Sequence, residues 1–189
     1  LLVKAEALQH TGSFKLRGAT NAVWSLDDAV SHVVACSSGT HAQGVARAVT
    51  ERGLKATIIM PEDTPATKIE GTKAYGADVV TYDRYTESRE EIGEALSQKY
   101  NANLIKPYDD VRVIAGQGTV GLEIARQVSV MGVVPNALIC CCGGGGLIAG
   151  TSIALHAHFP ETEIWSAEPE FYDDTKRSLE TGAIERAQT

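Results

Sequence analysis

Apolar positions recur along this chain with two different periods. Short runs of consecutive apolar residues predict buried strands, and longer segments with apolar residues every three or four positions predict helices. Val120, Ile124 and Val128, for example, share one stripe of a predicted helix. The predicted strands are residues 33–36, 56–60, 78–82, 103–105, 137–142 and 163–167. The predicted helices are residues 40–52, 65–75, 86–100, 118–131, 147–158 and 173–181, and Lys15 opens another.

The regular exchange of strand and helix predicts the fold class. Repeated β-α units give parallel sheets with helices on both faces, so we expect an α/β fold of open, twisted parallel sheets flanked by helices. Ligands of such sheets bind beyond the carboxyl ends of the strands. Residues 37–41 and 143–146 follow predicted strands and should lie there. Residues 106–113 read as a loop that crosses between two sheet units.

Composition and charge narrow the class of partner. The chain has 189 residues, of which 43% are hydrophobic, enough for one medium domain or two small ones. Its net charge of −7 disfavours nucleic acid as a partner. The longest apolar stretches, residues 137–142 and 147–155, are too short to cross a bilayer, so we expect no membrane partner. No signal-peptide pattern is present, and the chain begins at Leu1 without a methionine, so we read it as a fragment.

The cysteines indicate the cellular compartment rather than a metal site. Cys36, Cys140, Cys141 and Cys142 have no paired spacing, and three in a row on a strand point to alternate faces. The three therefore cannot all bind one metal ion. We interpret them as small buried residues in a reducing environment, and we expect a cytoplasmic protein.

Four consecutive glycines form the strongest local motif. Gly143, Gly144, Gly145 and Gly146 join a predicted buried strand to a helix that begins near Leu147. Glycines at this position let backbone N–H groups approach an anion, and the helix dipole favours its negative charge. The motif therefore predicts a phosphate-binding loop.

A dinucleotide is one alternative for that phosphate. Residues 144–149 also fit the pattern G-x-G-x-x-A, and Glu168 ends the next strand, where a ribose-binding acid would stand. This fingerprint normally occupies the first β-α unit, however, whereas here it comes late. It also leaves Lys15 without a role.

An amine and a second polar loop point to a different cofactor. A lysine that forms a Schiff base needs partial burial or a nearby positive charge, which Phe14, Leu16 and Arg17 can supply to Lys15. Residues 37–41, Ser-Ser-Gly-Thr-His, precede a predicted helix, whose free amides can hold a substrate carboxylate. An amine, a phosphate cradle and a carboxylate loop together predict pyridoxal phosphate acting on an amino acid.

An acidic segment follows the last predicted strand. Residues 168–174 carry four carboxylates within seven positions. Hard divalent cations prefer such oxygen-rich loops. A solvated acidic turn is the other interpretation.

Taken together, these motifs resemble the fold-type II pyridoxal-phosphate enzymes, which have a tryptophan-synthase-β-like architecture. The likeness is to the family of threonine/serine dehydratases and serine racemases, which includes 3-hydroxyaspartate dehydratases. Residues 13–19 resemble its cofactor-lysine motif, residues 37–44 its Ser-Ser-Gly-Asn-His-x-Gln loop, and residues 143–147 its phosphate loop. Residues 75–77 and 115–119 fit as well, so the likeness runs through nearly the whole chain.

The resemblance implies a role for each matching residue. Lys15 would hold the cofactor and take the Cα proton, and Ser38 would work on the opposite face of the substrate. The residues implied around the substrate carboxylate are Ser37, Ser38, Gly39, Thr40 and His41. The residues implied at the cofactor are Lys15, Thr40, Gly143, Gly144, Gly145, Gly146 and Leu147. In metal-dependent members, Mg²⁺ or Mn²⁺ is bound at positions that match Glu168, the carbonyl of Tyr172 and Asp174.

The resemblance also implies an architecture and one departure from the family pattern. Residues 1–36 and 114–189 would form a large cofactor-binding domain, incomplete at both ends, and residues 37–113 a small domain, in a homodimer. Thr40 stands where the family usually has an asparagine that hydrogen-bonds the 3-hydroxyl of the ring. Threonine is shorter and β-branched. The family's partner for the pyridine nitrogen lies in a C-terminal segment that this chain lacks.

The expected reaction is a β-elimination. A β-hydroxy amino acid such as threonine, serine or 3-hydroxyaspartate would yield a 2-oxo acid and ammonia. Because Ser38 is present, racemisation of serine or a related amino acid is the alternative within the same family. From other classes, a nicotinamide oxidoreductase fits the glycine loop with Glu168, and a non-catalytic relative fits the change at Thr40.

Overall fold

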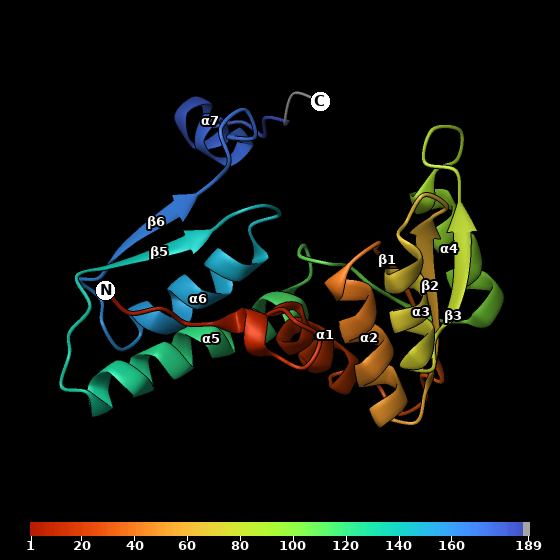
Figure 1. Cartoon of the computed structure of the whole chain (residues 1–189), viewed down its shortest axis with the longest axis horizontal. Helices are drawn as coiled ribbons and strands as arrows, with labels where there is room; N and C mark the ends of the chain where they lie inside the picture. Colours follow the sequence, from red (N-terminus) through yellow and green to blue (C-terminus); the bar gives the residue numbers. More distant parts are fainter. Residues whose placement is uncertain (187–189) are drawn as a thin grey trace. The chain divides into compact units, whose positions relative to one another are not determined.

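The computed structural model describes residues 1–186, which form two compact units (Figure 1). The first unit is Leu1–Gly116 and the second begins at Gln117, so the boundary falls inside helix α5 (Val111–Val130). The first unit contains η1 (Glu6–Leu8), α1 (Lys15–Trp24), β1 (His32–Cys36), α2 (Thr40–Glu51), β2 (Lys55–Pro61), α3 (Ala66–Ala74), β3 (Asp78–Tyr82), α4 (Arg89–Tyr100) and β4 (Asn103–Ile105). The second contains β5 (Ala137–Cys141), α6 (Gly146–His156), β6 (Glu163–Ala167) and α7 (Asp174–Thr181).

The first unit is built on a four-stranded parallel sheet with the strand order β3-β2-β1-β4. Strands β1 and β2 lie in its middle and are buried almost throughout, as parallel strands covered on both faces must be. Strand β2, which follows β1 in sequence, lies on one side of β1, and β4 lies on the other. In open α/β sheets, ligands bind at the carboxyl ends of the strands where the strand order reverses in this way.

Each face of this sheet has its own hydrophobic core. On one face, Val33, Ala35 and Ile58 pack with buried residues of α1 and α2. On the other, Val34 and Ile59 pack against the apolar side of α4 (Figure 1). The expected α/β fold, a parallel sheet with helices on both faces, is confirmed in this unit.

The second unit contains a parallel pair of strands, β5 and β6, and the helices that follow them. Cys140 on β5 is buried, whereas Ile139, on the opposite face of the same strand, is 72% exposed. Burial raises the pKa of the Cys140 thiol to about 12, so this thiol stays protonated, as expected of a packing residue. All four cysteines are free thiols, and Cys142 is buried as well. Cys36 is half-buried and Cys141 is exposed, so the prediction of buried cysteines is wrong for Cys141, which lies on the face of β5 opposite to Cys140.

All six predicted strands are confirmed, with each end within one residue of its predicted position. Two helices begin several residues away from their predicted starts. Helix α4 begins at Arg89 rather than residue 86, because the Ser88 hydroxyl accepts a hydrogen bond from Glu91 N and caps it. The expectation of a loop over residues 106–113 is wrong at its end, since α5 already begins at Val111. The carboxylate of Asp110 accepts a hydrogen bond from Arg112 N at 2.8 Å and so starts the helix early.

The proposed grouping of residues 1–36 with 114–189 into one domain stays a prediction. Over residues 1–186, no helix combines the length and the apolar character needed to span a bilayer.

Candidate active site

Lys15 is the first residue of α1, and its amine lies in a partly buried, largely aromatic setting. Its Nζ donates a hydrogen bond to the carbonyl of Pro107 at 2.8 Å. The same nitrogen lies 5.1 Å from the centre of the Phe14 ring and 6.0 Å from that of Tyr108. The sequence predicted the contribution of Phe14 but not that of Pro107 or Tyr108, because the latter two come from a distant part of the chain.

The turn that carries Lys15 is anchored by an ion pair. Arg17 donates to both carboxylate oxygens of Glu6, at 2.7 and 2.9 Å, and the two side chains are only 11% and 14% exposed. A two-point arginine–carboxylate contact of this kind fixes geometry as well as charge. The sequence suggested Arg17 as a positive charge near Lys15, but in the structure the carboxylate of Glu6 pairs with Arg17 and neutralises that charge.

Close helix packing adds to this anchoring. A Cβ placed on Gly116, early in α5, would lie 2.6 Å from the carbonyl oxygen of Arg17, so a side chain there would push α1 away. The glycine that the family pattern shares at this position thus allows α5 to approach the helix that carries Lys15.

Residues 37–39 connect β1 to α2, and Thr40 and His41 form the start of α2, as the predicted helix start at residue 40 requires. Gly39 is the N-cap of α2, and because glycine has no side chain, the cap residue cannot accept a hydrogen bond from the first amides of the helix. The hydroxyl of Ser37 instead accepts a hydrogen bond from Gly39 N at 3.2 Å, within the loop itself. The first turn of α2, which begins with Thr40, therefore keeps the amides and the dipole that favour a carboxylate.

His41 is buried beneath this loop, with 2% of its surface exposed. Its Nε2 lies 3.4 Å from the carbonyl oxygen of Ile105, and because a carbonyl only accepts, Nε2 carries the proton. Burial lowers the pKa of His41 to about 4, and the charge of Lys15 acts in the same direction. His41 is thus neutral at physiological pH and joins β4 to α2, while its role at the substrate stays a prediction.

Ser38 opens onto a cavity of about 390 Å³ at the carboxyl ends of the first three strands. Two arginines line it, Arg84 and Arg89, and Pro61, Tyr82, Glu87 and Glu90 complete the lining. Arg84 donates to Asp63 at 2.6 Å, and Arg89 donates to Glu90 at 2.7 Å. The sequence analysis missed both arginines, since neither stands in a recognisable motif.

In the second unit, the glycine loop connects β5 to α6. Gly145 is the N-cap of α6 and has φ +79°, a conformation that residues with a side chain rarely adopt. A Cβ on Gly143 or on Gly145 would meet nothing within 4 Å, so the loop borders open space. The helix begins with Gly146 and Leu147. Its cap residue, Gly145, has no side chain that could accept a hydrogen bond from the first amides of the helix. These features fit a phosphate at the N-terminus of α6.

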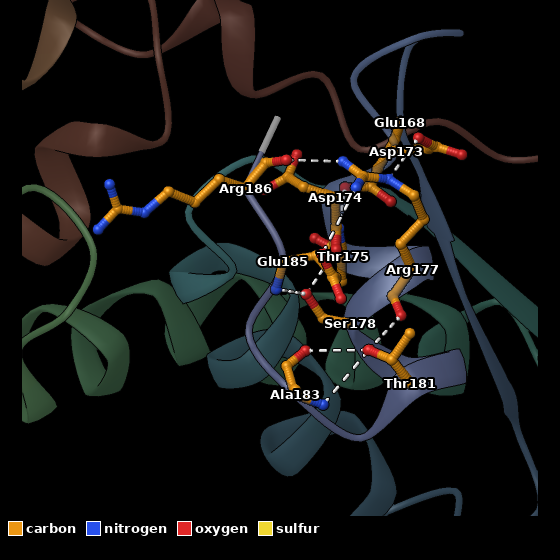
Figure 2. Close-up of polar contacts among 10 residues, drawn as sticks. All are labelled: Glu168, Asp173, Asp174, Thr175, Arg177, Ser178, Thr181, Ala183, Glu185 and Arg186. Carbon is orange, nitrogen blue, oxygen red and sulfur yellow. Dashed lines mark hydrogen bonds and ion pairs between the residues drawn. The ribbon is translucent and has the colours of Figure 1, made fainter. Parts of the chain in front are cut away.

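The acidic segment has a different arrangement. Glu168 accepts hydrogen bonds from Thr175 N and Lys176 N, each at 3.0 Å, and so caps α7 with both of its carboxylate oxygens. Burial works to raise the pKa of Glu168, but these hydrogen bonds outweigh it and hold that pKa below its ordinary value. Arg177 pairs with Asp173 at 3.2 Å in the same cluster (Figure 2).

This arrangement bears on the implied metal site. Among residues 1–186, no group of three or more histidine, cysteine, aspartate or glutamate side chains converges as a metal site would require. Each oxygen of Glu168 keeps one further lone pair. A cation bound there would have to share Glu168 with α7, and Tyr172 and Asp174 would have to supply the other ligands.

The structure assigns the predicted site residues to two places. Lys15 and residues 37–41 belong to the first unit, and the glycine loop and the acidic segment belong to the second. Within the first unit, a Cβ placed on Gly44 of α2 would lie 3.3 Å from Leu16 Cα of α1, so the first turns of these two helices pack closely together.

Comparisons with known proteins agree with this geometry. All 189 residues match the family described as pyridoxal-phosphate dependent enzyme. An L-threo-3-hydroxyaspartate ammonia-lyase from Pseudomonas sp is 44% identical over 191 residues, covering 100% of this chain and 59% of the relative. A serine racemase from Dictyostelium discoideum is 42% identical over 188 residues, covering 98% and 57%.

Solved structures give the same result. The crystal structure of a threonine deaminase from T.th. matches with a TM-score of 0.91 and 49% identity, covering 98% of this chain and 59% of that one. The chain thus spans less than two thirds of the length of the relatives it matches. Because the match extends over the whole sequence and includes the lysine and glycine motifs, the chain belongs to the family of pyridoxal-phosphate dependent enzymes, with the fold-type II architecture.

Proposed function

We propose that the protein is an ammonia-lyase that removes water from a β-hydroxy amino acid and releases a 2-oxo acid and ammonia. The observation that carries this proposal is the setting of Lys15. A lysine amine held at the start of α1 acts electrostatically on the loop that begins α2, whose N-terminus is suited to a carboxylate. Family membership favours pyridoxal phosphate over a nicotinamide dinucleotide as the cofactor.

The residues of this chain divide the work among them. The glycine loop and Leu147 would bind the phosphate of the cofactor, and Thr40 would lie at its ring. Ser37, Gly39 and the first amides of α2 would bind and orient the substrate carboxylate. Pyridoxal phosphate, when bound, supplies an electron sink for the pair left at Cα. Lys15 would take the Cα proton at Nζ, and the β-hydroxyl would leave as water after an acid near the cofactor phosphate has given it a proton.

A substrate with a second carboxylate is favoured by the cavity beside Ser38. Arg84 and Arg89 line that cavity and provide the guanidinium groups that recognise a carboxylate well. Among the relatives, one is named L-threo-3-hydroxyaspartate ammonia-lyase and another beta-hydroxyaspartate dehydratase. We therefore place 3-hydroxyaspartate ahead of threonine and serine as the substrate.

Racemisation is a second candidate, carried by Ser38. Its hydroxyl belongs to the loop that would bind the substrate and would act on the face opposite Lys15. Several relatives are named serine racemase, with identities of 39 to 42%. A small racemase activity beside the lyase activity is compatible with the same set of residues.

Three further properties belong to the proposal. Mg²⁺ or Mn²⁺ would bind to Glu168, the carbonyl of Tyr172 and Asp174, and the protein would be a cytoplasmic homodimer. A rise of the melting temperature with Mn²⁺ that is lost in Asp174→Asn would support the metal site. An equal rise in the variant would contradict it.

The proposal is tested by following 2-oxo acid release from 3-hydroxyaspartate, threonine and serine in the full-length protein. Lys15→Ala should lower the rate at least about a hundredfold, whereas Lys99→Ala should not. Borohydride reduction and peptide mapping should locate a pyridoxyl group on Lys15. Full activity in Lys15→Ala, or binding of a nicotinamide nucleotide without pyridoxal phosphate, would overturn the proposal. Normal turnover would dismiss the idea of a non-catalytic relative.

A further inference from the structure

The segment Pro107–Tyr108 connects β4 to α5 and lies beside Lys15, although Pro107 is 92 residues away along the chain. The residues that directly follow this segment in sequence hold it in place. Asp110 holds Arg112 through three hydrogen bonds of 2.7 to 3.1 Å, and Asn21 of α1 donates to the carbonyl of Arg112 at 2.7 Å. The helix that carries Lys15 and the segment that contacts its amine are therefore held in one framework.

The groups that surround the amine favour its charged form. A carbonyl oxygen accepts a stronger hydrogen bond from an ammonium than from a neutral amine. Aromatic faces within about 6 Å also attract a cation. Phe14 is the neighbour of Lys15 in sequence, so its contact is local, whereas the contact of Tyr108 depends on the fold. Buried His41 is neutral and brings no competing positive charge.

We propose that Tyr108 is a positioning residue for Lys15: its ring and the Pro107 carbonyl form a seat that holds the amine in place and stabilises its ammonium form by a small factor, so that the neutral amine stays accessible for its role as the base. This inference rests on the proposed function in that Lys15 is the reacting amine. During turnover, Lys15 takes the Cα proton and its ammonium then binds in the seat. The seat stabilises the proton on Nζ and holds the lysine side chain in one fixed position.

The seat is testable without any reaction, by labelling lysines in the full-length protein stripped of cofactor. Acetic anhydride reacts with the neutral amine, so a seat that favours the ammonium slows the labelling of Lys15. Tyr108→Leu keeps an apolar side chain and removes the ring. At pH 8 it should label Lys15 about threefold faster than the wild type, the factor that one cation–π contact is worth. Tyr108→Phe restores the ring and should label at the wild-type rate.

Controls separate the effect on charge from other effects. At a pH where all lysines are neutral, the rates of the wild type and Tyr108→Leu should converge, whereas a ring that merely shields Lys15 would keep them apart and overturn the proposal. Equal rates at pH 8, or a Tyr108→Phe variant as fast as Tyr108→Leu, would also overturn it. Lys99, which lies 5.0 Å from the Tyr100 ring, is labelled in the same sample and reports on the fold. Tyr108→Met is prepared in parallel and is decisive if Tyr108→Leu also exposes Lys99.

The labelling result is independent of turnover. A protein that shows the seat but no lyase activity would refute the proposed function alone. One that is an active lyase with equal labelling rates would refute the seat alone.

Discussion

The N-termini of α2 and α7 both follow a parallel strand, yet they are satisfied in different ways. At α7 the first amides are occupied by Glu168 of the same chain. At α2 the cap position is Gly39, which offers no side chain, and Ser37 bonds within the loop. Helix α6 resembles α2, with Gly145 at its cap. A helix N-terminus by itself therefore says little about function, and what matters is whether the chain fills it.

This comparison predicts that changes at the unfilled ends affect ligand binding, and that changes at the filled ends affect stability alone. The strongest test is Gly145→Val. A β-branched residue at φ +79° costs about 1–2 kcal/mol of stability and places a side chain where the phosphate would bind. We expect the affinity for pyridoxal phosphate, followed by its absorbance, to fall at least about tenfold, the effect of losing one good contact to an anion.

Gly132→Val is the matched control, because Gly132 has φ +68° and open space around it but lies at the far end of α5. It should lose similar stability in urea and keep its cofactor affinity. Equal affinity in the two variants would contradict the assignment of the phosphate to the start of α6.

The next effect in size is expected at Arg89, which lines the cavity beside Ser38. Arg89→Gln removes the charge and keeps a polar, though shorter, side chain. The ratio of kcat/KM for 3-hydroxyaspartate to that for threonine should fall by about a factor of ten, a value typical of one charge-assisted hydrogen bond. Arg47→Gln, which breaks an exposed pair with Glu51 on α2, should leave the ratio unchanged. If both variants keep the wild-type ratio, the cavity does not select for a second carboxylate.

At the filled end, Glu168→Ala should cost about 1 kcal/mol of stability through loss of the cap on α7. The pKa of Glu168 is lower in the folded protein than in the unfolded chain. The stability that its charge contributes is therefore fully present above the unfolded pKa and is lost as the pH falls through the lowered folded value. In urea titrations the difference between wild type and variant should shrink from pH 7 towards pH 3. Exposed Glu170→Ala serves as the control, and a difference that is constant with pH would argue against the cap.

The smallest effect is expected for Ser88→Ala, which removes the hydroxyl that accepts from Glu91 N at the start of α4. This filled end is exposed, so the cost should be about 0.5–1 kcal/mol, measured by urea unfolding. Cofactor affinity should not change. A loss of affinity would mean that the distinction between filled and unfilled helix ends does not separate binding from stability.

Periodicity predicted the positions of the strands well, because each is a short apolar run. It did not predict the burial of β5, which was expected to be a buried strand but of which only Cys140 is buried. It failed at the start of α5, where a side-chain contact between Asp110 and Arg112, rather than an apolar pattern, begins the helix. The glycine and serine loops were predictable since their chemistry is local. Tyr108 was not, because its place beside Lys15 arises only when β4 is added next to β1.

The acidic segment shows what composition alone cannot predict. Its composition favours a cation, but composition does not reveal that Glu168 is already engaged by two backbone amides. Arg84 and Arg89 illustrate the same point, since two ordinary surface arginines become notable only when the carboxyl ends of three strands bring them to Ser38.

The strand order β3-β2-β1-β4 also has a consequence for how such a protein can diversify. The seat of the lysine follows β4, the carboxylate loop follows β1, and the arginines that would read the substrate's side chain follow β3. The arginines that follow β3 are separate in sequence from the other two segments, so they can be replaced without changing the residues of the proposed lysine seat or of the proposed carboxylate loop. A new substrate preference can thus arise by mutations after β3 alone, on an inherited and unaltered chemical apparatus.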